Sequence, residues 1–255
     1  MKFINEKDLF LLEEVVRKNF SSKYKDSVLG IFWSVLHPLC MTIVLTIIFS
    51  TMLGRGIENY PVYLLSGRCV FGYFTGTVGS AMSVIKSNKN ILKKTASPKY
   101  IFVLGTVISE FLNFIITFAL LILVMIVTNA PLHLTMFFVV IPLISLIMMV
   151  TGLGLFMSVV TVYYSDVRYI WGVISQILLY GSAIFYLMSR IPEPYHQYVI
   201  LNPVYWIIEQ FRDFVVFGIM PNTINIINSY ILSSIILVFG IIIFKKYESD
   251  LMVQF

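Results

Sequence analysis

Six apolar segments separated by short polar stretches dominate this chain of 255 residues. A helix needs about 20 apolar residues to cross a hydrocarbon core of about 30 Å. The first segment is the clearest, because no Asp, Glu, Lys or Arg occurs between Ile31 and Gly54. The pattern predicts an all-α integral membrane protein with six transmembrane helices. The predicted spans are Ile31–Leu53, Pro61–Ile85, Tyr100–Thr128, Leu134–Tyr164, Tyr169–Met188 and Ile224–Phe244.

Composition supports membrane insertion. The chain is 58% hydrophobic and 12% charged, whereas ordinary soluble domains carry about 25% charged residues. Too few polar residues remain to cover a soluble surface, and the spans use most of the chain. Residues 1–255 are therefore expected to form a single transmembrane domain. Cys40 and Cys69 both fall in apolar runs, where small core hydrophobes are expected and a disulfide is not.

The positions of the basic residues predict the orientation. With a cytoplasmic N-terminus, 14 of the 18 Lys and Arg residues fall in cytoplasmic segments. Arg55, Arg190 and Arg212 fall outside, and Arg68 lies within a span. This bias follows the rule that positive charge stays inside. It indicates a multi-pass protein of the cytoplasmic (inner) membrane with both termini in the cytoplasm.

The two segments outside the spans have distinct patterns. Residues 1–30 are expected to be cytoplasmic, and Glu6–Phe20 carries apolar residues at three- and four-residue spacing, which is typical of an amphipathic helix. Such a helix lies along the membrane surface or packs on protein. The external segment 190–221 is too apolar for a free loop and too polar for a span. A pair of re-entrant or interfacial helices between spans five and six fits it.

The sequence holds no evident catalytic or nucleotide-binding motif. It contains no phosphate-binding loop of the Gly-x-x-x-x-Gly-Lys-Ser/Thr type, and its three His are far apart, so neither a bound cofactor nor a metal site is expected. Gly152 and Gly154 lie inside a span, where small residues allow close helix packing. These features favour transport or scaffolding over enzymatic activity.

The cytoplasmic loop 86–99 between spans two and three is the most basic feature. It has five Lys and no acidic residue. Charge alone permits two interpretations. Lysines hold such a loop at an anionic lipid surface, or they dock, together with Ile91 and Leu92, into a groove of another subunit. Lys23 and Lys25, before the first span, are expected to lie in water.

Two ionisable residues are predicted deep in the membrane. Glu110 lies about 15 Å into span three and Arg68 about 10 Å into span two, at 1.5 Å per residue. Charges at such depth are costly and face partners or a wet cavity. For Arg68 the sequence leaves two roles open, a structural pair or a lining of the transport path. For Glu110 a structural role is favoured.

Aromatic residues make up 15% of the chain. Most aromatic residues in membrane proteins face lipid or form interfacial belts. The alternative is an aromatic lining along which the C–H faces of sugar rings slide. The candidate lining residues in spans two and five are Phe71, Tyr73, Phe74, Tyr180, Phe185 and Tyr186.

Short motifs along the chain resemble one family. The run Lys23–Pro38 carries Lys-Tyr-Lys-x-Ser-x-Leu-Gly-x-x-Trp-x-x-x-x-Pro, and Tyr163–Val167, Ser182–Tyr186 and Leu201–Tyr205 resemble its later motifs, the last with Asn-Pro. The chain is similar to the transmembrane permease subunit of type-2 ABC exporters for polysaccharides, O-antigens and teichoic acids. Gly67 also matches that family. Arg68 and Val70, where the family usually has an apolar residue and Pro, depart from it.

The resemblance implies a set of partners and a mechanism. Two copies of the chain would form the path for a lipid-linked glycan, and a separate subunit would bind ATP and Mg²⁺. ATP-driven closure would open a gap between spans one and five of opposing copies. No nucleic-acid partner is expected. The family's coupling helix occupies loop 86–99, which assigns contact with the ATPase to Ser87, Asn88, Lys89, Asn90, Ile91, Leu92, Lys93 and Lys94.

Three other functions remain as alternatives. A type-2 ABC permease for a drug or small lipid shares the architecture, although the Lys23–Pro38 motif argues against it. An integral membrane enzyme acting on a lipid-linked sugar requires paired acids or His at one face, whereas Asp166 stands alone in the inner loops between spans. A secondary carrier or channel is expected to show inverted repeats, and none is seen.

Overall fold

The computed structural model describes residues 6–23, 29–51, 56–94 and 97–252, without the side chains of Lys94 and Met252. Regular structure within these residues is entirely helical, which confirms the all-α class. Several sequence-based expectations lie outside the described residues, namely those for Lys2, Tyr24, Lys25, Asp26, Ser27 and Arg55 and for positions 95–96 of the cytoplasmic loop.

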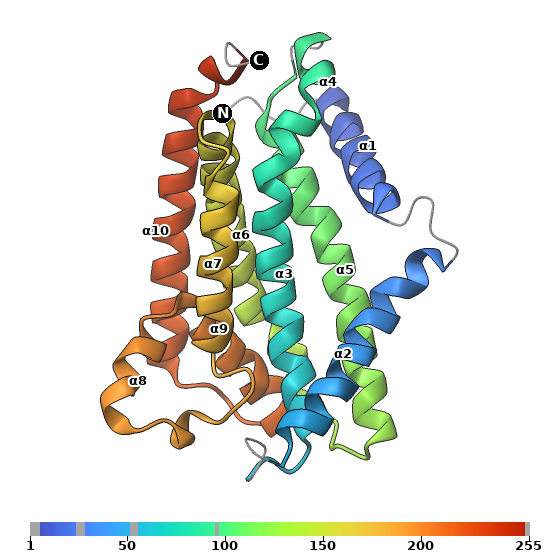
Figure 1. Ribbon diagram of the computed structural model, residues 1–255, viewed down its shortest axis with the longest axis vertical. Coiled ribbons are helices and arrows are strands. Elements are labelled where there is room, and N and C mark those ends of the chain that lie inside the picture. The colour runs from blue at the N-terminus through green and yellow to red at the C-terminus, as the bar shows by residue number, and fades with distance from the viewer. Residues whose placement is uncertain (1–5, 24–28, 52–55, 95–96, 253–255) are drawn as a thin grey trace.

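The long helices stand side by side as a bundle (Figure 1). The short helix α4 lies at one end, near the start of α1 and the end of α10, and α8 lies toward the other end. In chain order the helices are α1 (Glu6–Ser22), η1 (Gly30–Phe32), α2 (Trp33–Phe49), α3 (Tyr60–Ser87), α4 (Lys89–Lys94), α5 (Tyr100–Val127), η2 (Leu134–Val139), α6 (Val140–Tyr163), α7 (Val167–Tyr180), η3 (Met188–Arg190), α8 (Glu193–Ile200), α9 (Pro203–Arg212), η4 (Asp213–Phe217), α10 (Thr223–Tyr247) and η5 (Asp250–Met252).

Four helical segments among the described residues are long and apolar enough to cross a membrane. They are Gly30–Phe49, Tyr100–Val127, Leu134–Tyr163 and Thr223–Tyr247. Each overlaps a predicted span closely. The second and fifth predicted spans correspond to α3 and α7. Neither meets the length and apolarity of the other four: α3 is less apolar, and α7 is shorter.

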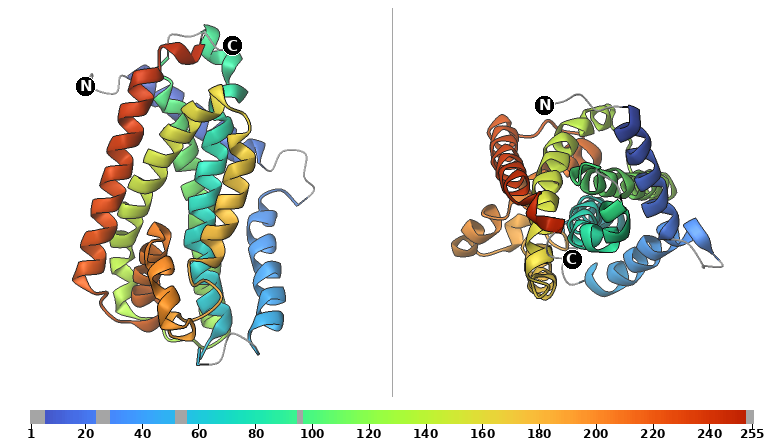
Figure 2. Two further views of the ribbon diagram at one scale, coloured as in Figure 1. Left: turned by 60° about the vertical axis from the view of Figure 1, so that its left-hand side comes forward. Right: turned by 90° about the horizontal axis from the view of Figure 1, so that it is seen from above.

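The helix α3 is long enough but less apolar because other helices surround it. Its 28 residues span about 42 Å, and 18 of them are buried. It contacts α2, α5, α6, α7 and α9, and a view along the bundle shows it near the middle (Figure 2). A helix that faces protein rather than lipid tolerates small and polar residues.

The helix α7 is shorter than the predicted span Tyr169–Met188. It has 14 residues and ends at Tyr180, a length of about 21 Å. Residues 181–187, hereafter the α7 break, leave the helix. Ala183 has a φ of 50° there, in the left-handed region that a helix cannot continue through.

The helices α6 and α10 make a very close contact at two glycines. A Cβ atom on Gly152 would lie 2.5 Å from the carbonyl oxygen of Ile236, and one on Gly240 would collide with the backbone of Gly152. Phe156 and Phe239 pack beside this contact with ring centroids 5.3 Å apart. The expectation that small residues serve close packing in this span is therefore confirmed.

The N-terminal helix α1 packs against α5. Val15 is 4% exposed and fills the space beside Gly105, where a Cβ atom would lie 2.5 Å from Val15 Cγ1. Leu9 and Phe10 remain 58% and 71% exposed. The helix therefore packs on protein along one side while other apolar residues stay available for a further surface.

The segment 190–221 contains two short helices, α8 and α9, joined near Leu201. The helix α9 is largely buried, with Ile207, Ile208 and Phe211 at 0% exposure, and it contacts α3, α6 and α10. A π-helical turn follows and ends at Gly218, whose φ is 67°. Two short helices are present where the sequence predicts a pair, and the second belongs to the core of the bundle, whereas their re-entry into the membrane stays a prediction.

Candidate functional site

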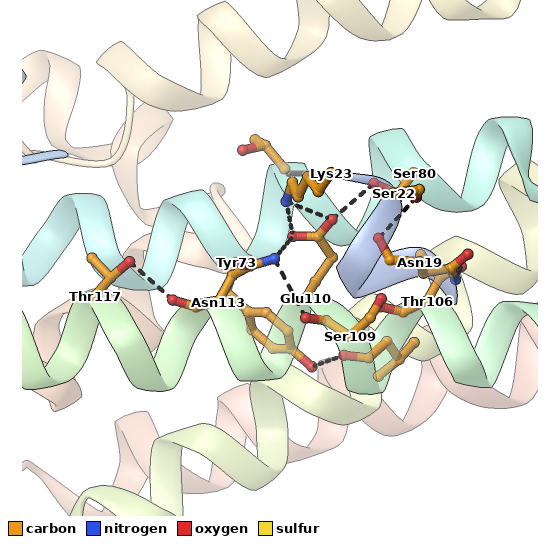
Figure 3. Close-up of polar contacts among 12 residues, drawn as sticks. Asn19, Ser22, Lys23, Tyr73, Ser80, Thr106, Ser109, Glu110, Asn113 and Thr117 are labelled. Atoms are coloured by element: carbon orange, nitrogen blue, oxygen red, sulfur yellow. Dashed lines mark hydrogen bonds and ion pairs between the residues drawn. The ribbon is translucent and has the colours of Figure 1, made fainter. Parts of the chain in front are cut away.

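A polar cluster around Glu110 lies between α3, α5 and the residue after α1 (Figure 3). The Lys23 ammonium is 2.8 Å and 2.9 Å from the two carboxylate oxygens. Ser80 donates to the same carboxylate at 3.0 Å and Asn113 at 3.1 Å. The side chain of Glu110 is 9% exposed, so these donors offset the cost of burying its charge.

Two features of α3 and α1 allow this cluster to form. Gly76 leaves room for the carboxylate, because a Cβ atom there would lie 3.2 Å from Glu110 Oε2. Asn19 in α1 donates to Thr106 in α5, which brings the end of α1 to the depth of Glu110. Lys23 is exposed as expected, with a side chain that is 46% accessible, but the sequence did not predict that its ammonium reaches the buried carboxylate.

A cavity of about 470 Å³ extends from this cluster along α3 toward its first residues. Three helices form its walls: α2 through Trp33 and His37, α3 through Arg68 and Gly72, and α5 through Phe114. A second, smaller cleft of about 240 Å³ shares Lys23, Glu110 and Asn113 with the first and is lined largely by Ser, Thr and Asn. The two spaces meet at the cluster.

Arg68 does not pair with Glu110, a possibility that the sequence left open. Gly76 lies against Glu110, and Arg68 precedes Gly76 by two helical turns, or about 12 Å along α3. Arg68 lines the cavity, and no hydrogen bond or ion pair joins it to another of the described residues. The two charges therefore sit at opposite parts of the same space.

At the other end of the bundle, tyrosines from α3 bind the α7 break. The Tyr60 hydroxyl donates to the Phe185 carbonyl at 3.0 Å. The Tyr63 hydroxyl lies 2.7 Å from the Tyr186 carbonyl oxygen and 3.1 Å from that of Ala183. Carbonyls released by a broken membrane helix require such partners, so α3 stabilises the break.

Arg212 at the end of α9 completes this arrangement. It is 3% exposed and donates to the carbonyls of Ala183 at 2.9 Å, Ile184 at 3.0 Å and Tyr63 at 3.2 Å. Its guanidinium also lies 3.6 Å from the centre of the Tyr63 ring. A Cβ atom on Gly67 would lie 2.5 Å from Arg212 Nη2, which explains the glycine at that position.

The Asn-Pro motif fixes the start of α9. Asn202 accepts from the Val204 amide at 3.0 Å, which caps the helix. Its amide group also donates to Ser182 Oγ at 2.7 Å and to the Leu178 carbonyl at 3.1 Å. One side chain therefore both begins α9 and ties it to the end of α7.

The Lys-rich loop 86–99 contains the six-residue helix α4. Leu92 is 6% exposed and Asn88 is 3% exposed, and Lys18 of α1 donates to Asn88 at 2.7 Å. These two predicted contact residues thus face the protein interior and hold α4 in place. Four predicted contact residues on or beside α4 carry exposed side chains, namely Ser87, Lys89, Asn90 and Lys93, and Ile91 is 38% exposed.

Most of the proposed aromatic lining is core instead. Phe71, Tyr73 and Phe74 are 7%, 3% and 1% exposed, and Phe185 is 6% exposed. Tyr73 packs between Phe111 and Phe114 of α5, because the surrounded position of α3 turns its aromatic residues toward other helices. Phe71, Phe74 and Phe185 therefore pack inside the bundle, and Tyr73, although buried, borders the cavity. Tyr180 is 60% exposed and Tyr186 is partly exposed.

Sequence reasoning missed Arg212 and the partner of Glu110. Arg212 was assigned to the external segment because of its neighbours, although its spacing from the apolar residues of α9 places it on the buried face. Cys69 is buried as predicted, whereas Cys40 is exposed on α2. Neither the Lys23 contact nor the Arg212 contacts leave a local sequence signal, because each joins residues far apart in the chain.

Comparison with known proteins identifies the family. The model of the ABC-2 type transporter family matches residues 11–216. The O-antigen export system permease protein RfbA of Klebsiella pneumoniae is 27% identical over 240 residues, 93% of this chain and 92% of its own. The polysialic acid transport protein KpsM of Escherichia coli is 22% identical over 247 residues, 96% and 93% of the two chains. The chain belongs to the ABC-2 type transporter family and is a multi-pass membrane protein.

Proposed function

We propose that this chain is the permease subunit of an ATP-driven exporter. The exporter moves a lipid-linked polysaccharide, of the O-antigen, capsule or teichoic acid type, outward across the cytoplasmic membrane. The observation that carries the proposal is the extent of the match to an O-antigen export permease, which covers 93% of this chain and 92% of the relative. The capsule polysaccharide export inner-membrane protein CtrC of Neisseria meningitidis, 22% identical over 79% of this chain, supports the same substrate class.

The proposed topology has six crossings with both termini in the cytoplasm. The helices α2, α3, α5, α6 and α10 each cross once, and α7 crosses together with its break. The helices α8 and α9 enter from the outside and return. Two observations support this orientation: α4, the start of α1 and the end of α10 share one end of the bundle (Figure 1), and the Lys-rich loop lies there.

The proposed assembly has two copies of this chain and a separate ATPase that binds ATP and Mg²⁺. The helices α2 and α7, which would face each other across the two copies, carry exposed apolar residues. Ile47 is 71% exposed, and Ile177 is 66% exposed. The exposed lysines of α4 and Ile91 would contact the ATPase. The permease itself would perform no chemistry, and its described residues hold no cluster of three His, Cys, Asp or Glu suited to a metal.

Deletion of the gene in its native host tests this proposal. We expect the surface polysaccharide to be lost and the lipid-linked glycan to accumulate inside the cell, and a plasmid copy to restore export. Normal surface polysaccharide together with altered resistance to a drug would instead support a type-2 ABC permease for a drug or small lipid. Undiminished synthesis of the glycan excludes an enzymatic role in its assembly.

A further inference from the structure

Arg68 lies in the cavity between α2, α3 and α5 without a compensating charge among the described residues. The ion pair between Lys23 and Glu110 neutralises the part of the space that lies at Glu110. Arg68 lines the other part, about 12 Å further along α3. A guanidinium in a membrane segment is costly without a partner, so its position indicates that an anion enters from elsewhere.

The shape of the cavity indicates what kind of anion fits. Its volume of about 470 Å³ is in the range of small-molecule sites. The lining that Arg68 shares includes the apolar residues Leu65, Phe114 and Trp33, together with polar residues such as His37 and Thr117. Gly72 also lines the space, and nothing lies within 4 Å of the position that its Cβ atom would take. A cation next to an open apolar surface suits a ligand with a charged head and a hydrocarbon chain.

The second cleft gives this ligand a polar route. It is lined mostly by hydroxyl and amide side chains, including Ser80, Ser83 and Ser87, and its charged lining residues are the paired Lys23 and Glu110, where it meets the cavity. A polar headgroup that follows this route passes from the end of the bundle where α3 ends to Arg68, deep in the bundle. Hydroxyl and amide groups replace water for a headgroup without holding it through charge.

We propose that the cavity binds the phosphate headgroup of a long-chain lipid, with Arg68 as its charged ligand and the wall at Leu65, Phe114 and Trp33 against the hydrocarbon chain. Arginine suits this role because its planar fork binds two phosphate oxygens at once. If the lipid is the polyprenyl phosphate carrier of the exported glycan, this inference rests on the proposed function. A bilayer phospholipid presents the same phosphate chemistry, and the experiment separates the two sources.

Trp33 provides a probe within the wall of the cavity. The chain has three Trp, so Trp171→Phe and Trp206→Phe leave Trp33 alone. The full-length protein in detergent is titrated with phosphatidylglycerol that carries brominated acyl chains, which quench tryptophan fluorescence on contact. Brominated diacylglycerol, which has no phosphate, gives the background. We expect saturable quenching with the phosphate lipid only.

Substitutions at two positions then test the site. Arg68→Gln is expected to raise the half-quenching concentration about tenfold or more, because charge-assisted hydrogen bonds to phosphate are lost, and Arg68→Lys is expected to restore most of the binding. Gly72→Leu, which fills the open space without changing charge, is expected to abolish saturable quenching. Gly172→Leu on α7, where nothing lies within 4 Å either, is the matched control. Unchanged titrations for Arg68→Gln and Gly72→Leu would overturn the proposal.

Competition identifies the source of the phosphate. We expect unlabelled polyprenyl phosphate to displace the brominated lipid at lower concentration than unlabelled phosphatidylglycerol does, and polyprenol without phosphate to be ineffective. More effective displacement by phosphatidylglycerol would overturn the link to the carrier lipid. The titration needs neither glycan nor ATPase, so failure of the lipid site remains distinguishable from failure of the export function, which the deletion strain reports.

Discussion

The contact between Gly67 and Arg212 offers a quantitative test of how α9 and the α7 break are anchored to α3. In Gly67→Ala the new methyl group would lie 2.5 Å from Arg212 Nη2, so the guanidinium must move. That nitrogen donates to the carbonyls of Ile184 and Tyr63 at 3.0 Å and 3.2 Å. Moving it weakens both hydrogen bonds at once.

The expected magnitude follows from two opposing effects. Losing two hydrogen bonds from a charged group costs about 3 kcal/mol at about 1.5 kcal/mol each. Alanine in place of glycine inside a helix contributes about 1 kcal/mol in the other direction. The net loss of about 2 kcal/mol corresponds to a fall of about 4–8 °C in the apparent Tm for a chain of this size.

A double-mutant cycle measured by thermal unfolding of the detergent-solubilised protein isolates this contact. In an Arg212→Met background the collision is gone, so Gly67→Ala should leave the apparent Tm unchanged or raise it by about 2–4 °C. Gly72→Ala, on the same helix with nothing within 4 Å, controls for the helix effect. An equal fall in both backgrounds would refute the assignment of the cost to Arg212.

Three further predictions concern other parts of the molecule. Glu110→Gln removes the ion pair that holds Lys23 at α5. It should lower the apparent Tm by about 2–12 °C, because about 1–3 kcal/mol is lost with a buried charged partner; an unchanged Tm would contradict the pairing. Gly240→Leu drives a side chain into the backbone of α6 and should abolish the monodisperse peak in size-exclusion chromatography, which an intact peak would disprove. The substitutions Lys89→Glu and Lys93→Glu should reduce co-purification of the ATPase without changing Tm, whereas full recovery of the ATPase would remove α4 from the interface.

Four of the six predicted spans are confirmed, because crossing a membrane imposes a length and a composition on each helix. The predicted Tyr100–Thr128 and the observed Tyr100–Val127 differ by one residue. The same rule failed for the fifth span, because residues 181–187 are as apolar as a helix would be. Their irregular backbone depends on Arg212 and on tyrosines from α3, which only the tertiary structure brings into contact.

The candidate site was less predictable than the fold. The position of Glu110 along its helix correctly predicted that it lies inside the protein. Its partner Lys23, however, comes from a segment 87 residues earlier. The aromatic residues of α3 illustrate the opposite error. Their clustering in the sequence suggested a lining, whereas helices on several sides of α3 make them core. Sequence spacing specifies the face of a helix but not which neighbour covers it.

ATP-dependent movement of a lipid-linked glycan in proteoliposomes tests the central claim most directly. The chain is co-purified with the ATPase that it recovers from native membranes and is reconstituted with the host's own lipid-linked glycan. The account predicts that ATP and Mg²⁺ transfer the glycan to the opposite leaflet and that an ATPase variant unable to hydrolyse ATP does not. Equal glycan movement with and without hydrolysis, or an ATPase that never co-purifies, would contradict it.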